Sequence, residues 1–408
     1  MVKPSFSKPS YLQVFKNVPK KVKWLIYLIS FQTLGFGFFI VVVAAYLPEI
    51  GLGSGAVGLI LGVSGLIFVV SAIPLGMVSD SRGRKWILIL GNLGLTPTLL
   101  IIAFTHDIVY LVLAGLIAGV SEGAFMSSWN AMIADQTTLE NRDAAFSLSF
   151  IITTVTMGLG FAVPILFPPL ISLTNIDSIT IHQYALIFFA LLGLISPISL
   201  LFLLRDYKEV RHPGRLFLKG KSTKMLLKFS GINGLIGLGA GFIIPLIPTW
   251  LFLEFGIFDA VSGPLIAVAS LTIGFAAIGS AGLAKKYGHI RAIVLTQGLS
   301  MGFMLAIAFI PSVLVIGVFY VIRTALMNMS VPIADSYLMS IITREERGLA
   351  SAINSIGWRL PNSVSTIGGG LLLEAGFYDL PFVIATAFYI TSIMLLFIVF
   401  KDVKPRGD

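Results

Sequence analysis

Between two apolar runs, near 56–78 and 86–104, the chain reads Gly76-Met77-Val78-Ser79-Asp80-Ser81-Arg82-Gly83-Arg84-Lys85. A glycine at position 83 permits a tight turn that other residues resist. The carboxylate of Asp80 can face guanidinium groups or the positive end of a helix. We interpret this segment as a short charged turn that joins two helices.

The composition around this turn indicates a membrane protein. The chain has 408 residues, of which 56% are hydrophobic and only 12% charged. Such a composition cannot build a water-facing surface, which excludes a soluble enzyme, a disordered scaffold and, despite a net charge of +9, a nucleic-acid binder. The absence of cysteine excludes a disulfide framework, a zinc–cysteine site and an iron–sulfur cluster.

Apolar runs of about 20 residues, the length that crosses a bilayer core, recur along the whole sequence. We therefore predict an all-α polytopic protein with twelve transmembrane helices. The predicted spans lie near 24–46, 56–78, 86–104, 108–133, 146–170, 184–204, 229–251, 263–284, 290–310, 313–340, 349–373 and 380–400.

The basic residues are distributed unequally between the two sides that these spans define. Of the 28 Lys and Arg residues, all but Arg323 and Arg359 fall at the two termini or in alternate loops on the same side. Loops on the opposite side carry acids, such as Glu49 and Asp259. By the positive-inside rule both termini are expected in the cytoplasm, and a multi-pass protein of the plasma membrane is expected.

The two sets of six spans match at a constant offset of 205 residues, for example Gly51 with Gly256 and Gly83 with Gly288. We predict a duplicated unit, with an N-terminal bundle in 1–204, a cytoplasmic linker in 205–228 and a C-terminal bundle in 229–408. Copies with an even number of spans run parallel, as in alternating-access carriers.

The turn after the second span resembles the signature of the major facilitator superfamily, G-x-L-A-D-R-x-G-R-K. Its expected conformational motif comprises Gly76, Asp80, Arg82, Gly83, Arg84 and Lys85. The resemblance implies that Asp80 contacts the other bundle and closes the cytoplasmic side of the outward-facing state.

Two further stretches are similar to the drug and proton antiporter branch of this superfamily: Tyr46-Leu47-Pro48-Glu49-Ile50, and Asn130 to Asp135. The fifth span departs from that branch because it lacks a Gly-Pro pair. The first span departs too, since its core holds Gln32 rather than a carboxylate.

Three ionisable residues lie at membrane depth: Glu122, Arg323 and Arg359. A central arginine costs roughly 2.5–3.5 kcal/mol on insertion scales, so each should face the bundle interior or a wet cavity. The two arginines could form an anion site, or each could pair with a protein acid, Asp335 being a candidate for Arg323. Glu122 could carry a proton, or form a structural ion pair with either arginine.

Other polar residues could line the same cavity, namely Gln32, Asn328, Asn354 and Trp358. They could equally serve interhelical packing. The histidines, among them His106 and His182 on the external side, have no ligand partner nearby in sequence, so no metal site is expected.

These features predict a secondary transporter, not an enzyme, that moves a small organic solute by alternating access. Proton-coupled, multidrug-like efflux is the first expectation. The alternative is an anion transporter for an organic phosphate or carboxylate that uses Arg323 and Arg359. The expected partners are the solute, protons and the lipid bilayer. No cofactor and no nucleic acid are expected, and a monomer is expected.

Overall fold

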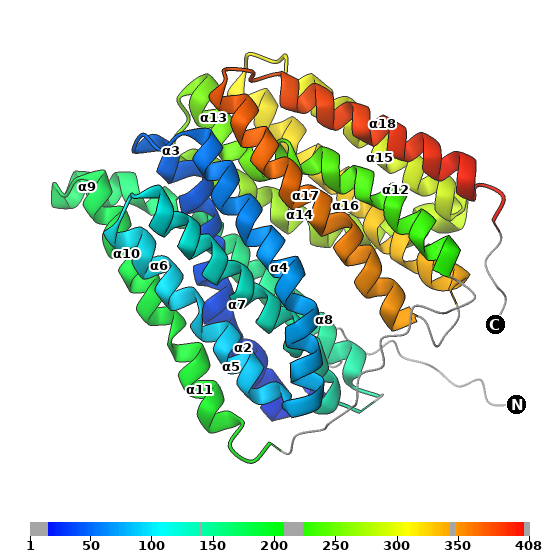
Figure 1. Cartoon of the computed structure of the whole chain (residues 1–408), viewed down its shortest axis with the longest axis horizontal. Helices are drawn as coiled ribbons and strands as arrows, with labels where there is room; N and C mark the ends of the chain where they lie inside the picture. Colours follow the sequence, from blue (N-terminus) through cyan, green and yellow to red (C-terminus); the bar gives the residue numbers. More distant parts are fainter. Residues whose placement is uncertain (1–14, 139, 208–222, 343–346, 404–408) are drawn as a thin grey trace, which may run out of the picture.

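The computed structural model describes residues 15–138, 140–207, 223–342 and 347–403, and all regular structure in these ranges is helical (Figure 1). In the N-terminal half the helices are α2 (Lys20–Val41), η1 (Val42–Tyr46), α3 (Leu47–Glu49), α4 (Ser54–Arg82), α5 (Arg84–Leu93), α6 (Leu95–Phe104), α7 (Ile108–Asp135), α8 (Arg142–Ala162), η2 (Val163–Leu166), α9 (Phe167–Thr174), α10 (Ser178–Gly193) and α11 (Ile195–Leu203). In the C-terminal half they are α12 (Thr223–Gly241), η3 (Ile244–Leu246), α13 (Ile247–Phe255), α14 (Asp259–Tyr287), α15 (His289–Ile307), α16 (Val313–Ile341), α17 (Arg347–Glu374) and α18 (Leu380–Phe400).

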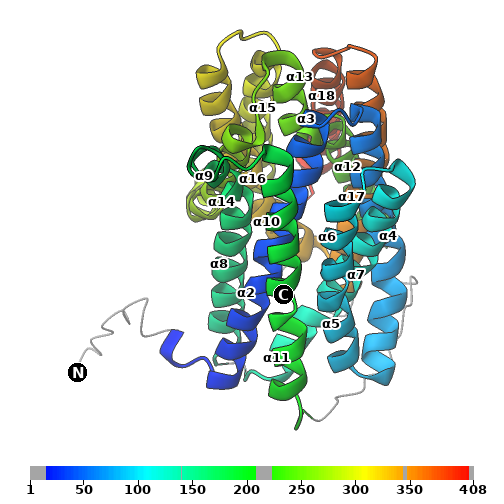
Figure 2. The same ribbon diagram turned by 90° about the vertical axis from the view of Figure 1, so that its left-hand side faces the viewer.

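The predicted helical membrane architecture is confirmed. Within the described ranges, eleven helical segments are long and apolar enough to cross a bilayer. The remaining predicted span, 349–373, corresponds to α17, which is less apolar because it carries Arg359 and a polar face. It packs along α4 and α12. Figures 1 and 2 show the helices from α2 to α11 in one bundle and those from α12 to α18 in a second.

Two details differ from the sequence expectation. Residues 171–183, which lie between two predicted spans, are largely helical, because α9 runs to Thr174 and α10 begins at Ser178. His182 therefore lies within a helix, where it is buried. Most of the predicted linker, 208–222, lies outside the described residues, and α12 already begins at Thr223.

The two ends of the molecule differ in charge. We call the end where α2 begins and α18 ends the basic end, since Lys20, Arg84 and Lys285 lie there. The opposite end, which carries Glu49, Asp177, Asp259 and Glu374, is the acidic end.

The internal repeat is visible in the backbone. Gly51 and Gly256 both have positive φ, +94° and +65°, and so do Gly83 and Gly288, with +119° and +79°. Members of each pair are 205 residues apart. A left-handed backbone conformation favours glycine, which explains why these matched turns keep it.

The repeat also relates the contacts between the bundles. A Cβ on Gly58 would lie 2.7 Å from the carbonyl oxygen of Thr366, and one on Gly263 would lie 2.4 Å from that of Phe161. Both partners of the first contact are displaced by 205 residues from those of the second. Thus α4 packs on α17 as α14 packs on α8, about a pseudo-two-fold axis between parallel bundles.

The bundles are joined at the acidic end and separated toward the basic end. Figure 1 shows α4 and α17 side by side at the acidic end and diverging toward the basic end. In the basic half, a cavity of about 720 Å³ lies between α8 and α14, lined by Phe150, Val155 and Phe275 among others. The structure is therefore the state closed at its acidic end and open at its basic end.

Candidate functional site

A central cavity of about 230 Å³ lies between the two bundles. Helices α2, α4, α7 and α8 line it from one side, and η3 and α17 from the other. Its wall is formed by Phe36, Phe39, Ile40, Leu61, Ser64, Gly65, Glu122, Met157, Pro245, Arg359, Asn362, Ser363 and Thr366. The wall is thus mostly apolar and aromatic, with one acid and one base.

Those two charged residues bind each other across the bundles. Arg359 Nη2 of α17 donates to Glu122 Oε1 of α7 at 2.5 Å. The Arg359 guanidinium also lies 4.5 Å from the centroid of the Phe68 ring. The side chain of Arg359 remains 35% exposed and that of Glu122 13%, so the arginine presents the larger free surface. Of the pairings the sequence left open for Glu122, the structure shows the one with Arg359.

Arg323 lies elsewhere. It is 4% exposed on α16, where Nη2 donates to the hydroxyl of Tyr389 on α18 at 2.7 Å. Its carbonyl accepts from Ser300 on α15, and it does not line the central cavity. Its partner is therefore Tyr389 rather than the candidate Asp335, and the two arginines do not share one site in this conformation.

The other predicted lining residues serve helix packing here. Asn354 accepts a hydrogen bond from Asn233 of α12, Asn328 donates to the carbonyl of Thr324 one turn earlier, and Gln32 is buried within α2. The side chain of Trp358 packs partly buried against the hydrophobic core, and its backbone carbonyl lies against Gly237 of α12. None of these four residues lines the central cavity.

The charged turn is organised within its own bundle. Arg84 is buried and pairs with Asp80 at 3.2 Å and with Asp135 at the end of α7. The hydroxyl of Tyr207 donates to the same Asp135 carboxylate. The expected contact of Asp80 with the other bundle is absent among the described residues, because the bundles are apart at this end.

The six motif residues differ in their surroundings. The positive φ of Gly83 fits the expected tight turn. Arg82 is exposed and Lys85 partly buried. Gly76 does not lie at a close helix approach in this conformation, since a Cβ there would meet only Ser127, at 3.6 Å.

The acidic end is closed by helix caps supplied from the opposite bundle. The N-termini of α4 and α14 have no side-chain cap of their own. Glu374 of α17 accepts from the N–H of Gly55 in α4, and Glu49 of α3 accepts from the N–H of Asp259 in α14. Each carboxylate thereby satisfies an unpaired N–H and faces the positive end of a helix.

A second polar contact accompanies these caps. His182 of α10 is hydrogen-bonded to Asp259, with Nε2 2.7 Å from Oδ2. No pattern in the sequence predicts this pair, since 77 residues separate its members.

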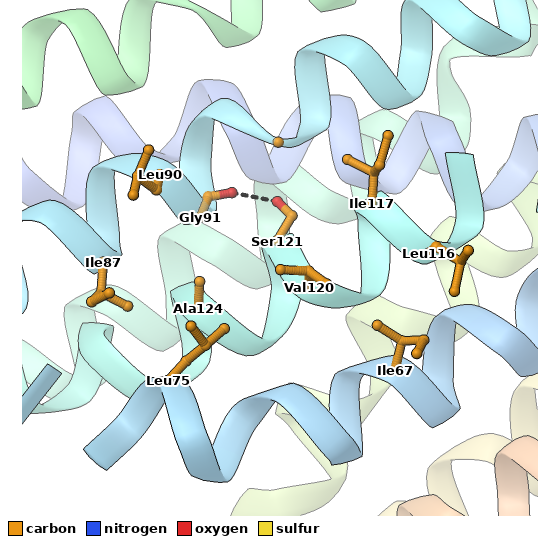
Figure 3. Close-up of a pocket in the computed structure, with 11 residues that line it drawn as sticks. Ile67, Leu75, Ile87, Leu90, Gly91, Leu116, Ile117, Val120, Ser121 and Ala124 are labelled. Atoms are coloured by element: carbon orange, nitrogen blue, oxygen red, sulfur yellow. Dashed lines mark hydrogen bonds between the residues drawn. The ribbon is translucent and has the colours of Figure 1, made fainter. Parts of the chain in front are cut away.

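Another cavity, of about 400 Å³, lies within the N-terminal bundle among α4, α5 and α7 (Figure 3). Leucine, isoleucine, valine and alanine side chains dominate its wall. Its one hydroxyl, of Ser121, is already bonded to the carbonyl of Gly91. With no ionisable group in its lining, this pocket offers no means of coupling, and the central cavity remains the candidate site.

Comparison with known sequences agrees with this geometry. The profile of the Major Facilitator Superfamily matches residues 25–230 and 229–408. The chain belongs to the Major Facilitator Superfamily. Its two matched regions agree with two bundles built on one repeat, and the family's members are transporters that alternate access to a central site.

Two similar proteins carry names that describe multidrug resistance. The chain is 22% identical to multidrug resistance protein MdtG of Proteus mirabilis, over 89% of this chain and 90% of that one. It is 25% identical to the multi-drug resistance efflux pump PmrA of Streptococcus pneumoniae, over 86% and 87%.

Among solved structures, the chain resembles an inward-facing bacterial homologue of the lysosomal transporter Spinster, with a TM-score of 0.72, 14% identity and coverage of 93% and 97%. It also resembles the human organic anion transporter MFSD10, with a TM-score of 0.63, 16% identity and coverage of 93% and 100%. At these identities the structural likeness shows the shared fold.

Proposed function

We propose that the chain is a proton-coupled exporter of small organic solutes, with its basic end in the cytoplasm of the cell and Glu122 as the proton carrier. The observation that carries the proposal is the Glu122–Arg359 pair, which joins the bundles in the wall of the central cavity. The names of the efflux relatives support export. The basic residues at one end support the orientation.

The geometry gives the coupling a physical basis. A proton on Glu122 neutralises the carboxylate and removes the charge attraction to Arg359. The contact between α7 and α17 then weakens at the depth of the cavity, where a solute would bind. Because solute and proton compete for the same pair, loading one favours release of the other, which is the requirement for exchange.

The cavity wall indicates which solutes fit. Phe36 and Phe39 supply aromatic surface, while Ser64, Asn362 and Thr366 supply a few polar groups. Sites of this kind bind compact molecules with an apolar body and a small polar pole.

Transport by reconstituted protein tests the proposal. With the membrane potential clamped, tetraphenylphosphonium should accumulate in proteoliposomes with an acidic lumen and not in protein-free vesicles. Glu122→Gln should abolish accumulation driven by the pH gradient and retain exchange without a gradient. The matched control Glu254→Gln changes an exposed acid at the end of α13 and should behave as the unaltered protein. Gradient-driven accumulation by Glu122→Gln at the unaltered rate would overturn the assignment of Glu122.

A second candidate is transport of an organic carboxylate or phosphate. The specific observation in its favour is the exposed third of Arg359, whose guanidinium can bind a second anion beside Glu122. Arg323 is occupied by Tyr389, so this candidate rests on Arg359 alone. Thermal shifts with benzoate that vanish in Arg359→Gln, together with none for tetraphenylphosphonium, would favour it.

A further inference from the structure

Three ionisable side chains meet at the acidic end, outside the central cavity. His182 comes from the N-terminal bundle, as does Glu49, whereas Asp259 comes from the C-terminal bundle. His182 Nε2 lies 2.7 Å from Asp259 Oδ2, and Glu49 Oε1 lies 2.6 Å from the backbone nitrogen of Asp259. His182 is 1% and Asp259 3% exposed.

The hydrogen-bonding surroundings of His182 require a bound proton. Its Nδ1 lies 2.7 Å from the carbonyl oxygen of Ser178, and its Nε2 faces the carboxylate of Asp259. Both ring nitrogens thus face oxygen acceptors. A neutral imidazole carries one N–H and would leave one nitrogen lone pair against an oxygen, whereas an imidazolium donates to both. A proton in the Nε2–Oδ2 contact is therefore required for a complete set of hydrogen bonds.

The cluster can exist only while the acidic end is closed. Opening that end moves Asp259 away with the C-terminal bundle and leaves His182 with the N-terminal bundle. Tyr46 stacks on the imidazole at 3.6 Å, with Phe167 edge-on at 4.5 Å, and these rings belong to the same bundle as His182. The histidine thus keeps its aromatic setting on opening and loses its anionic partner.

We propose that Glu49, His182 and Asp259 form a second proton-binding site, at the acidic end, in which a bound proton holds that end closed. The proposal rests on alternating access and does not require Glu122 to couple transport. It assigns to His182 a role that the central cavity does not supply.

The direction follows from linkage. In the closed state a proton in the Nε2–Oδ2 contact joins the two bundles, and opening breaks that contact, so the bound proton and the closed acidic end favour each other. Acid therefore favours the closed acidic end and alkali favours its opening. For one proton the ratio of open to closed molecules changes by up to about tenfold per pH unit.

Other titratable groups face the cluster. Tyr46 lies against His182, and His106 lines a cavity of about 140 Å³ together with Tyr46. Asp177 precedes α10, and hydrogen bonds from the backbone N–H and hydroxyl of Thr180 hold its pKa below the ordinary value. Asp177 therefore stays ionised from pH 5.5 to pH 9 and contributes no titration of its own, while His106 requires a control.

The test measures opening of the acidic end directly. The chain has no cysteine, so Val109→Cys and Leu314→Cys can carry a unique pair of spin labels. These residues are 71% and 79% exposed and begin α7 and α16, one in each bundle at the acidic end. Double electron–electron resonance in nanodiscs at several pH values then gives the fraction of molecules with the longer, open distance.

We expect the open fraction of the labelled protein to rise with pH and that of its His182→Gln variant to lose most of this response, since the carboxyl groups of Glu49 and Asp259 remain. Asp259→Asn, which also removes the ion pair, should be more open at acid pH and lose most of the response. His106→Gln, the matched control, should keep it. An open fraction independent of pH in the labelled parent, or an unchanged response in His182→Gln and Asp259→Asn, would overturn the proposal.

Glu122→Gln in the same labelled background separates the two proposals. If the proton site is correct, this variant keeps the pH response of the acidic end whatever happens to its transport. Loss of the response in Glu122→Gln with retention in His182→Gln would assign the proton to the central cavity and sink the second site.

Discussion

Glu374, the last residue of α17, accepts a hydrogen bond at 2.8 Å from the backbone N–H of Gly55 in the first turn of α4. A helix of one bundle is thus capped by a carboxylate of the other. The acidic end is held closed by a contact that water can replace whenever the bundles separate. Such a cap contributes to the equilibrium between conformations without making either one irreversible.

Removing this cap should open the acidic end. Glu374→Ala removes the acceptor of the Gly55 N–H at the start of α4, at a cost of about 0.5–2 kcal/mol to the closed state. The open fraction measured between labels at Val109 and Leu314 should rise accordingly. Glu254→Ala, at an exposed site of the same end, is the control. Equal open fractions in both variants would mean that the cap does not contribute.

The glycine contact between α4 and α17 gives a stronger perturbation. A Cβ on Gly58 would lie 2.9 Å from the Cα of Gly370 and still closer to the carbonyl of Thr366, and backbone atoms cannot swing aside. Gly58→Val should disfavour the closed acidic end by about 1–3 kcal/mol, the usual cost of overpacking.

The same spin-label distance checks this, and Gly263→Val should act alike through the repeat-related contact with Phe161. Gly298→Val places the same side chain where a Cβ meets nothing within 4 Å, so it should leave the distance distribution unchanged. A closed acidic end in Gly58→Val would contradict the prediction.

The depth of a charged residue in the membrane could be predicted from the sequence. The direction in which its side chain points around the helix axis could not. A charge such as Glu122 or Arg359 in an apolar run must find a polar setting, and that cost identified both residues of the central pair. Successive residues of a helix point about 100° apart, so the neighbour of a lining residue usually faces away. Trp358 accordingly packs against the hydrophobic core while Arg359 faces the cavity.

A usable signal was nevertheless present in α17. Arg359, Asn362, Ser363 and Thr366 all line the central cavity, and their spacing of three, four and seven residues marks one face of a helix. The contact between His182 and Asp259 carries no such signal, because it depends on how two bundles meet. The contacts of Gly58 and Gly263 repeat at the offset of 205 residues that the sequence shows. The contact between His182 and Asp259 is not repeated at this offset, so the offset does not predict it.

Asp135 is expected to stabilise the basic end of the N-terminal bundle. Its carboxylate accepts from both Arg84 and the hydroxyl of Tyr207. Asp135→Asn should lower the free energy of unfolding by roughly 1.5–3 kcal/mol, the range for hydrogen bonds that involve charged groups. Thermal melting of the purified protein checks this. Asp143→Asn, an exposed acid in the first turn of α8, should melt as the unaltered protein does.

The two arginines at membrane depth should respond differently to substitution. Arg323 is buried and donates to Tyr389, so Tyr389→Phe removes an acceptor from a buried cation and should destabilise the fold by about 1.5–3 kcal/mol. Transport per folded molecule should stay close to that of the unaltered protein, because neither residue lines the central cavity. Arg359→Gln should show the reverse, with a smaller change in melting temperature and a large loss of gradient-driven transport. Melting curves and initial rates measured on the same preparations separate the two effects. A Tyr389→Phe protein that melts normally yet binds solute weakly would contradict this prediction and indicate that Arg323 takes part in solute binding.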